Sequence, residues 1–262
     1  MRKKRLSVLG SGGLANIITE AYLKGLLDEY DLICFCGRNR EKTEALAAKA
    51  NCRAVFSTED MLALDPDITA ELASVSAVKE NALAILGKGV DLVPLSIGAF
   101  ANKEFYDRVK ICAAENDAHV YLPSGAIGGF DIMQTITLMG DCDVRFSMKK
   151  GAAAMKGTPV FSENLLTETA TRTVFSGTAG QAIELLPTKV NISIATALAT
   201  TGIDNVKTRI DIVPGMEDDD ITIEISGSEA SAVLNFYSKP ADIAGWSVVS
   251  LLRSLVSPVL FI

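Results

Sequence analysis

The sequence predicts an α/β protein in which a doubly wound parallel sheet is followed by a second α+β domain of mainly antiparallel strands. From residue 5 to about 122, short apolar runs alternate with stretches of helical periodicity. This alternation is typical of a parallel sheet with helices on both faces. After residue 122, strand-like segments follow one another with few helices between them, which indicates antiparallel pairing.

We assign residues 1–122 to the first domain. Two of its apolar runs, DLICFCG and DLVPLS, have no polar alternation, as expected of strands covered on both faces. Helical patterns separate the runs, at ANIITEAYLKGLL, REKTEALAAKA, TEDMLAL, SAVKENALAILGKG and NKEFYDRVKICAAEN. The expected strands are RLSVLG, DLICFCG, CRAVF, DITAELA, DLVPLS and HVYLPSG.

We assign residues 123–241 to the second domain. Its helices are expected at GGFDIMQTITLMG and VNISIATALATTG, and its strands at DVRFSMKKGA, TRTVFSGT, KTRIDIVPG, DDITIEISGS and SAVLNFYSK. The apolar tail, residues 242–262, is expected to form a helix that packs back on the first domain or on a partner subunit.

Composition excludes several classes of protein. A net charge of −7 argues against nucleic-acid binding, which needs a basic surface. No apolar run is long enough for a membrane helix, and the start MRKKRLSVLG lacks the apolar core of a signal peptide, so we expect a cytoplasmic protein. Five cysteines without CxxC spacing indicate neither disulfides nor a metal site, and His119 is the one histidine.

A glycine-rich loop follows the first strand. Gly10, Gly12 and Ala15 satisfy G-x-G-x-x-G/A between a strand and a helix. In that context the glycines permit a tight turn and close approach of a pyrophosphate, and the helix N-terminus favours the phosphates. The alternative is a purely structural turn. We favour dinucleotide binding by a Rossmann-type domain.

The end of the second expected strand bears on the choice of nicotinamide cofactor. NAD enzymes tend to carry an acidic residue there, but this chain has Gly37, followed by Arg38, Asn39 and Arg40. Guanidinium groups pair with a 2′-phosphate that a carboxylate would repel. We therefore expect NADP or NAD, with NADP favoured; the alternative is that both arginines are simply solvated.

Four segments resemble the L-aspartate dehydrogenase family: LSIGAF, YLPSGAIGGFD, VFSGTAGQAIELLPTKVNISIATALA and the final SLLRSLVSPV. The resemblance covers nearly the whole chain. It implies that the first domain binds NAD(P), that the second closes over it with a small-molecule substrate, and that L-aspartate is interconverted with iminoaspartate or with oxaloacetate plus ammonia. It also implies a homodimer or larger homo-oligomer, such as a tetramer, formed through the second-domain sheet.

The residues of these segments suit such a site on physical grounds. Ser124, Gly125 and Ala126 are small enough for the backbone to lie against a flat ring, although glycines here also suit a hinge between domains. Asn191 opens an expected helix, as an N-cap or as a ligand contact. The expected cofactor-binding residues are Gly10, Gly12, Gly13, Leu14, Ala15, Arg38, Asn39, Arg40, Ala73, Ser74, Gly98, Ala126 and Asn191.

The chain departs from the family at the histidine that handles the proton. A count without gaps from Pro214 places Ile221 there, directly after Asp219 and Asp220. We expect Asp219, Asp220 or Lys150 to take the catalytic role, with Lys149, Lys150 and Lys189 as partners for a substrate carboxylate.

The acidic run at residues 217–220 leaves the substrate open. It is a solvated turn or, at the mouth of a substrate site, it would repel a dicarboxylate such as aspartate. The expected function is an NAD(P)-dependent dehydrogenase of an amino acid or imine. The alternatives are an NADP-dependent reductase of another imine or carbonyl compound, and a non-catalytic NAD(P)-binding sensor.

Overall fold

The computed structural model describes residues 2–187, 189–239 and 242–260 and divides them into two compact units. Unit 1 runs through Gly125 and resumes at Asp242, whereas unit 2 begins at Ala126. The domain boundary predicted at residues 122 and 123 lies just before this division, and the end predicted at 241 lies outside the described residues. No helix among the described residues is long and apolar enough to cross a membrane.

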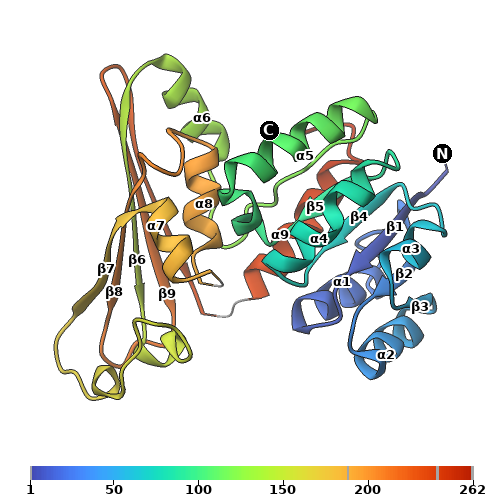
Figure 1. Ribbon diagram of the computed structural model, residues 1–262, viewed down its shortest axis with the longest axis horizontal. Helices are drawn as coiled ribbons and strands as arrows, with labels where there is room; N and C mark the ends of the chain where they lie inside the picture. The colour runs from blue at the N-terminus through green and yellow to red at the C-terminus, as the bar shows by residue number, and fades with distance from the viewer. Residues whose placement is uncertain (1, 188, 240–241, 261–262) are drawn as a thin grey trace. The chain divides into compact units, whose positions relative to one another are not determined.

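Unit 1 is built on a five-stranded parallel sheet of order β3-β2-β1-β4-β5 (Figure 1). The order reverses between β1 and β4, which confirms the doubly wound parallel fold that the sequence predicts. The carboxyl ends of β1, β2 and β4 therefore meet at one edge, where such sheets bind ligands. The strands are β1 (Lys4–Leu9), β2 (Tyr30–Cys36), β3 (Arg53–Val55), β4 (Ile68–Glu71) and β5 (Asp91–Pro94).

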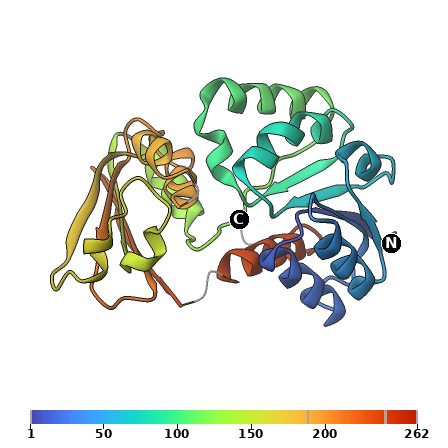
Figure 2. The same cartoon turned by 60° about the horizontal axis from the view of Figure 1, so that its bottom comes forward.

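Helices cover both faces of this sheet, with α1, α2 and α9 on one side and α4 and α5 on the other (Figure 2). Several begin at a side chain that accepts a backbone N–H bond, including Asn39, Ser74 and Asn102, which is why they start where they do. The helices are α1 (Gly13–Leu23), α2 (Arg40–Ala50), α3 (Thr58–Leu62), α4 (Val75–Leu86), the 3₁₀ turn η1 (Ile97–Ala101), α5 (Lys103–Glu115) and α9 (Asp242–Ser254).

The C-terminal helix α9 completes the core of unit 1. Val248 and Leu252 are buried in the same apolar cluster as the sheet and α1, and Gly245 lies against Ile17 so closely that a methyl group would meet it at 2.6 Å. The Tyr30 hydroxyl donates a 2.7 Å hydrogen bond to the Leu252 carbonyl. Burial raises the pKa of Tyr30, which keeps this hydroxyl a neutral donor.

Two predicted elements of unit 1 differ from the structure. HVYLPSG is not a strand, because only Val120 forms a bridge, with Leu92 of β5. The C-terminal helix stops at Ser254, ahead of Pro258, whose missing N–H suits the irregular stretch that follows. Residues 261 and 262 lie outside the described residues.

Unit 2 carries a second five-stranded sheet of order β10-β9-β6-β8-β7 with helices on one face (Figure 1). Its pairs are antiparallel except β6 with β8, so the prediction of mainly antiparallel strands is confirmed. The elements are α6 (Phe130–Met139), β6 (Cys142–Lys150), the 3₁₀ turns η2 (Ala152–Met155) and η3 (Glu163–Leu166), β7 (Arg172–Thr178), α7 (Ala179–Leu185), α8 (Asn191–Leu198), β8 (Lys207–Ile212), β9 (Asp219–Gly227) and β10 (Ser231–Ser238).

Helix α7 was not predicted as a separate element. Thr178 and Gln181 form a capping box that begins it directly after β7. The signal T-A-G-Q is present in the sequence, but GTAGQ is also typical of a loop because of its two glycines.

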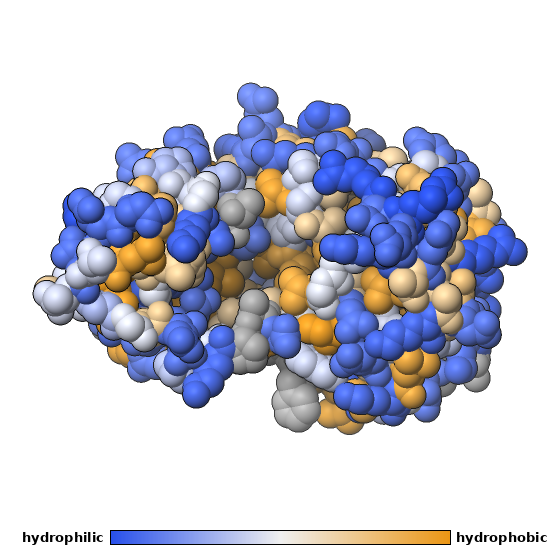
Figure 3. All heavy atoms as spheres, turned by 90° about the horizontal axis from the view of Figure 1, so that it is seen from below, coloured by the Kyte–Doolittle hydropathy of each residue, from blue (hydrophilic) through white to orange (hydrophobic). Residues whose placement is uncertain are grey.

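The surface shown in Figure 3 is largely hydrophilic, with exposed apolar side chains only in small groups.

We expect Tyr30→Phe to lower the free energy of unfolding by about 1–3 kcal/mol, because the buried Leu252 carbonyl loses its side-chain donor. Urea denaturation measures the change. Tyr106→Phe in the same unit is the control, since that ring is only partly buried. Equal losses in both variants would show that the bond to α9 contributes nothing specific.

Candidate functional site

The glycine loop at the end of β1 is shaped by close backbone contact. Gly10 has a φ of 136°, and a Cβ there would lie 2.6 Å from the Leu72 carbonyl oxygen, so only glycine fits. Gly12 is the N-cap of α1 and makes no side-chain cap bond. A Cβ at Gly12 or Gly13 meets nothing within 4 Å. The loop therefore leaves open space in front of free N–H groups at a helix N-terminus, which suits a phosphate.

A cavity of about 550 Å³ lies at this edge of the sheet. The glycine loop, the segment after β2, the start of α3 and the β4–α4 loop line it. Six of the predicted cofactor residues are among the lining residues: Gly10, Gly12, Arg38, Asn39, Ala73 and Ser74.

The basic residues after β2 do not share one role. Arg38 is exposed and lines the cavity, while Asn39 caps α2 by accepting from the Lys42 N–H. Arg40 does not line the cavity: its guanidinium stacks 3.9 Å from the Phe56 ring centroid and pairs with Glu44 at 3.4 Å. Lys42 and Phe56 also line the cavity, and neither is among the residues predicted from the sequence. The position of Lys42 in the first turn after Arg38 was the available signal.

The other predicted cofactor residues lie outside the lining of this cavity. Gly13, Leu14 and Ala15 belong to the first turn of α1, and Gly98 is buried in η1. Ala126 and Asn191 belong to unit 2. Asn191 is the first residue of α8, one position after the N-cap Val190, so the N-cap alternative is wrong. Gly129 is the N-cap of α6 and has a left-handed conformation, with a φ of 74°, that glycine adopts without strain.

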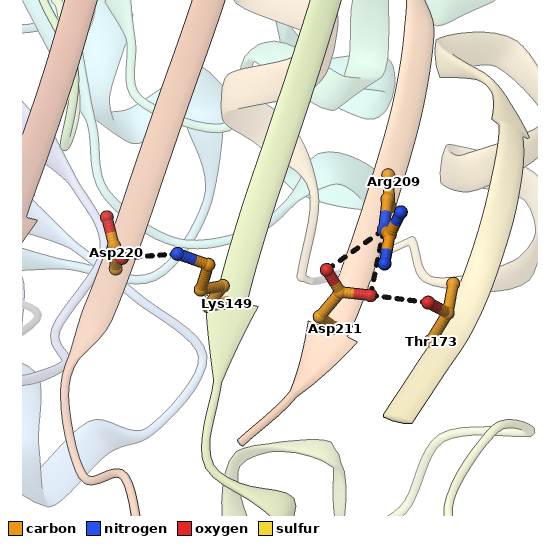
Figure 4. A network of polar contacts seen from close by, with 5 residues as sticks. All are labelled: Lys149, Thr173, Arg209, Asp211 and Asp220. Carbon is orange, nitrogen blue, oxygen red and sulfur yellow. Dashed lines mark hydrogen bonds and ion pairs between the residues drawn. The ribbon is translucent and has the colours of Figure 1, made fainter. Parts of the chain in front are cut away.

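In unit 2, the predicted catalytic residues form two ion pairs between β6 and β9. The Lys150 ammonium lies 2.8 Å from the Asp219 carboxylate, and its side chain is only 12% exposed. The Lys149 ammonium lies 3.1 Å from Asp220, and that lysine is 49% exposed (Figure 4). Successive residues of a strand point to opposite faces, so the two pairs lie on opposite faces of the sheet.

Ile221 identifies the face that each pair occupies. Its side chain is 1% exposed in the core beneath the helices, paired in register with Met148, which is also buried. Asp219 is two residues before Ile221 and Lys150 two after Met148, so this pair shares the helix-covered face. Asp220 and Lys149 lie on the other face, as does the Arg209–Asp211–Thr173 network (Figure 4). Thus Asp220 does not share a face with the position of the family histidine.

His119 lies in unit 1, with its side chain exposed, its Nδ1 3.6 Å from an Asp91 oxygen and its ring stacked on Tyr121. No group of three or more His, Cys, Asp or Glu side chains in the described part of the chain is arranged to hold a metal. Burial raises the pKa of the Cys36 thiol, which lines the cavity, to about 11.

Comparison with protein families matches both parts of the chain. Residues 131–255 match the model "Aspartate dehydrogenase, C-terminal", and residues 10–123 match "Homoserine dehydrogenase, NAD binding domain".

Curated relatives match along the whole length. L-aspartate dehydrogenases of Methanococcus maripaludis strain C5 and Methanocaldococcus jannaschii are 29% and 27% identical, each over 97% of this chain and 98% of the relative. The solved structure of aspartate dehydrogenase from Thermotoga maritima matches with a TM-score of 0.77 at 23% identity, covering 98% of this chain and 99% of that one. A hyperthermophilic archaeal homoserine dehydrogenase in complex with NADPH matches with a TM-score of 0.57 at 14% identity.

We expect Gly12→Ala to weaken dinucleotide binding at least about tenfold without lowering the melting temperature. The new methyl group meets no protein atom within 4 Å but occupies the space in which a pyrophosphate would approach the backbone. Titration of NADPH by fluorescence measures the affinity. Gly180→Ala in α7 of unit 2, where a new methyl group meets only ordinary contacts of 3.6 Å or more, is the control and should bind within about threefold of the unaltered protein. Unchanged binding by Gly12→Ala would contradict the placement.

Proposed function

We propose that this chain, an aspartate dehydrogenase-like, NAD-binding oxidoreductase, prefers NADP and oxidises the α-amino group of L-aspartate or a closely related amino acid. The observation that carries the proposal is the full-length similarity to L-aspartate dehydrogenases, combined with a lysine–carboxylate pair beside the position of the missing histidine.

The cavity of unit 1 fits a dinucleotide. Gly12 and the N-terminus of α1 would hold the pyrophosphate, because the space before them is open and the N–H groups there are free of a side-chain cap. Bound there, the nicotinamide supplies the hydride acceptor or donor. The remaining chemistry, which is to orient the substrate and move its proton, falls to the protein.

The preference for NADP rests on charge at the end of β2. Gly37 stands where a carboxylate would bind a ribose hydroxyl, and the Arg38 and Lys42 side chains belong to the lining. The two carboxylates of the lining, Glu59 and Glu80, come from α3 and α4 rather than from this strand end. A 2′-phosphate would gain two cations and meet no carboxylate at this strand end.

The Lys150–Asp219 pair supports a route for the proton. The Asp219 carboxylate lies 2.8 Å from the Lys150 ammonium, and a carboxylate at this place could accept a proton from the substrate amine. Lys150 holds Asp219 in place and supplies positive charge for a substrate carboxylate. Asp220 is bound to Lys149 on the other face, and we do not assign it a role in the reaction.

The acidic run at residues 217–220 does not present four free carboxylates. Asp219 and Asp220 are paired with lysines of β6, and Asp218 accepts from the Tyr237 hydroxyl. The two lysines therefore offset part of the repulsion of a dicarboxylate that the sequence suggests, which leaves L-aspartate as a candidate substrate.

Ile221 favours a second candidate function, the NADP-dependent reduction of another imine or of a carbonyl compound, since a buried isoleucine cannot take the part of a histidine. Assays with amino acids, and with keto acids in the presence and absence of ammonia, separate the two. Reduction of a carbonyl without ammonia would favour the second function, and binding of NADPH without any turnover would contradict both.

We propose further that the protein is a cytoplasmic homo-oligomer, a dimer or tetramer. The face of the unit 2 sheet without helices supports this, because several of its charged side chains already form ion pairs with one another, which lowers the cost of covering them. Light scattering after size-exclusion chromatography tests the state, and a monomer would contradict it.

We expect Arg38→Ala and Lys42→Ala each to raise the KM for NADPH about tenfold while changing the KM for NADH less than about threefold, because only NADPH carries the 2′-phosphate. Steady-state kinetics with both cofactors measure this. Arg40→Ala is the control, since Arg40 is not a lining residue and its guanidinium is already engaged by the Phe56 ring and the Glu44 carboxylate. A parallel rise in both KM values, or an unaltered protein that prefers NADH, would contradict the NADP preference.

We expect Lys150→Met and Asp219→Asn to lower kcat/KM at least about 100-fold, the usual scale for a lost proton-transfer group. Lys149→Met and Asp220→Asn break the equivalent pair on the other face and should stay within about threefold. Kinetics of L-aspartate oxidation at saturating NADP⁺, alongside melting temperatures of all four variants, make the comparison. Equal losses in both pairs would assign the effect to the stability of the sheet instead.

A further inference from the structure

The carboxyl group of Glu71 is buried at the carboxyl end of β4, beside the cavity but not in it. Glu71 is 0% exposed, and its carboxyl oxygens accept four hydrogen bonds. Oε1 accepts from the Ala73 N–H at 2.7 Å, the Ser74 N–H at 2.8 Å and the Ser96 hydroxyl at 3.0 Å. Oε2 accepts from the Ser96 N–H at 3.0 Å. One side chain thereby ties the β4–α4 loop to the segment after β5.

The loop held by Glu71 is a wall of the cavity. Leu72, Ala73 and Ser74 all line it. The same backbone lies against the glycine loop, since a Cβ on Gly10 would be 2.6 Å from the Leu72 oxygen and 3.2 Å from the Ala73 nitrogen. A shift of this loop would therefore change both the width of the cavity and the space that is left for Gly10.

The donor set suits an ionised carboxylate. Four donors and two oxygens match the acceptor capacity of a carboxylate, whereas an amide of the same shape would turn an NH₂ group toward at least one donor. Burial raises the pKa of Glu71, and the hydrogen bonds from Ala73, Ser96 and Ser74 oppose that shift. A buried carboxyl is costly unless its hydrogen bonds are made, so its presence needs a reason beyond packing.

We propose that Glu71 is a positioning residue for the dinucleotide: by fixing Ala73 and Ser74 it sets the β4 side of the cavity against the glycine loop. This inference rests on the proposed placement of the cofactor. In a doubly wound sheet the dinucleotide crosses the switch point, here between β1 and β4. The adenosine half belongs on the β2 side, near Arg38, and the other half passes the loop that Glu71 holds.

The test compares two probes, NADPH and adenosine 2′,5′-bisphosphate, on Glu71→Gln by fluorescence and calorimetry. We expect the Kd for NADPH to rise at least about tenfold and that for adenosine 2′,5′-bisphosphate to change less than about twofold. Thr69→Val is the matched control, because it removes another buried hydrogen bond of β4, to Ser7 at 2.8 Å. It should bind both probes normally, even with an equal loss of melting temperature.

Several outcomes decide against the proposal. The proposal would be overturned if Glu71→Gln left the NADPH affinity unchanged, if it weakened the binding of both probes equally, or if Thr69→Val had the same effect. None of these results would contradict the proposed cofactor site. If Glu71→Gln does not fold, Ser96→Ala takes its place, because it removes only the hydroxyl bond. Ser96→Ala should raise the Kd for NADPH about threefold and leave the Kd for adenosine 2′,5′-bisphosphate unchanged. An unchanged Kd for NADPH would overturn the inference. An unaltered protein that binds neither probe would overturn the cofactor placement and this inference together.

Discussion

The ligand-binding part of unit 1 depends on one backbone contact. Gly10 of the glycine loop lies against the Leu72 carbonyl at the start of the β4–α4 loop. β1 and β4 are neighbours in a sheet whose winding reverses between them, so their following loops diverge and leave a hollow at the strand ends. Gly10 lets the two backbones approach to a distance that no side chain allows. The Glu71 carboxylate and the open space before Gly12 are then parts of one arrangement, in which backbone groups rather than side chains shape the cavity.

Unit 2 shows how strand alternation separates residues that are adjacent in sequence. Lys149 and Lys150 differ by one position, as do Asp219 and Asp220, yet the structure gives one pair to the helix-covered face and the other to the exposed face. Only the pair on the face of Ile221 can stand in for a histidine at that position. The distinction depends on the register between β6 and β9.

The sequence was sufficient for the fold and for part of the cavity. Alternating apolar runs predict the parallel sheet, and the G-x-G-x-x-A pattern predicts Gly10 and Gly12, because these features depend on local spacing. Phe56 and Lys42 were missed because their place in the lining follows from the packing of β3 and α2 beside β2. Glu71 was missed because its donors Ala73, Ser74 and Ser96 come together only across two strands. The place of Arg40 outside the lining could not be foreseen, because its stacking on Phe56 is a tertiary contact.

The discontinuity of unit 1 has a consequence for synthesis of the chain. Helix α9 supplies Val248, Val249 and Leu252 to a core whose other buried members lie before residue 94. The carbonyl that accepts the hydrogen bond of the Tyr30 hydroxyl belongs to Leu252, which lies 222 residues later in the sequence. A chain emerging from the ribosome from its N-terminus therefore holds an open apolar face beside α1 until α9 has been synthesised. Unit 2 begins at Ala126 and is continuous in sequence, so all of its residues are synthesised before α9. The dinucleotide-binding part begins earliest and is finished last, so its nascent form is the one that most needs protection from aggregation.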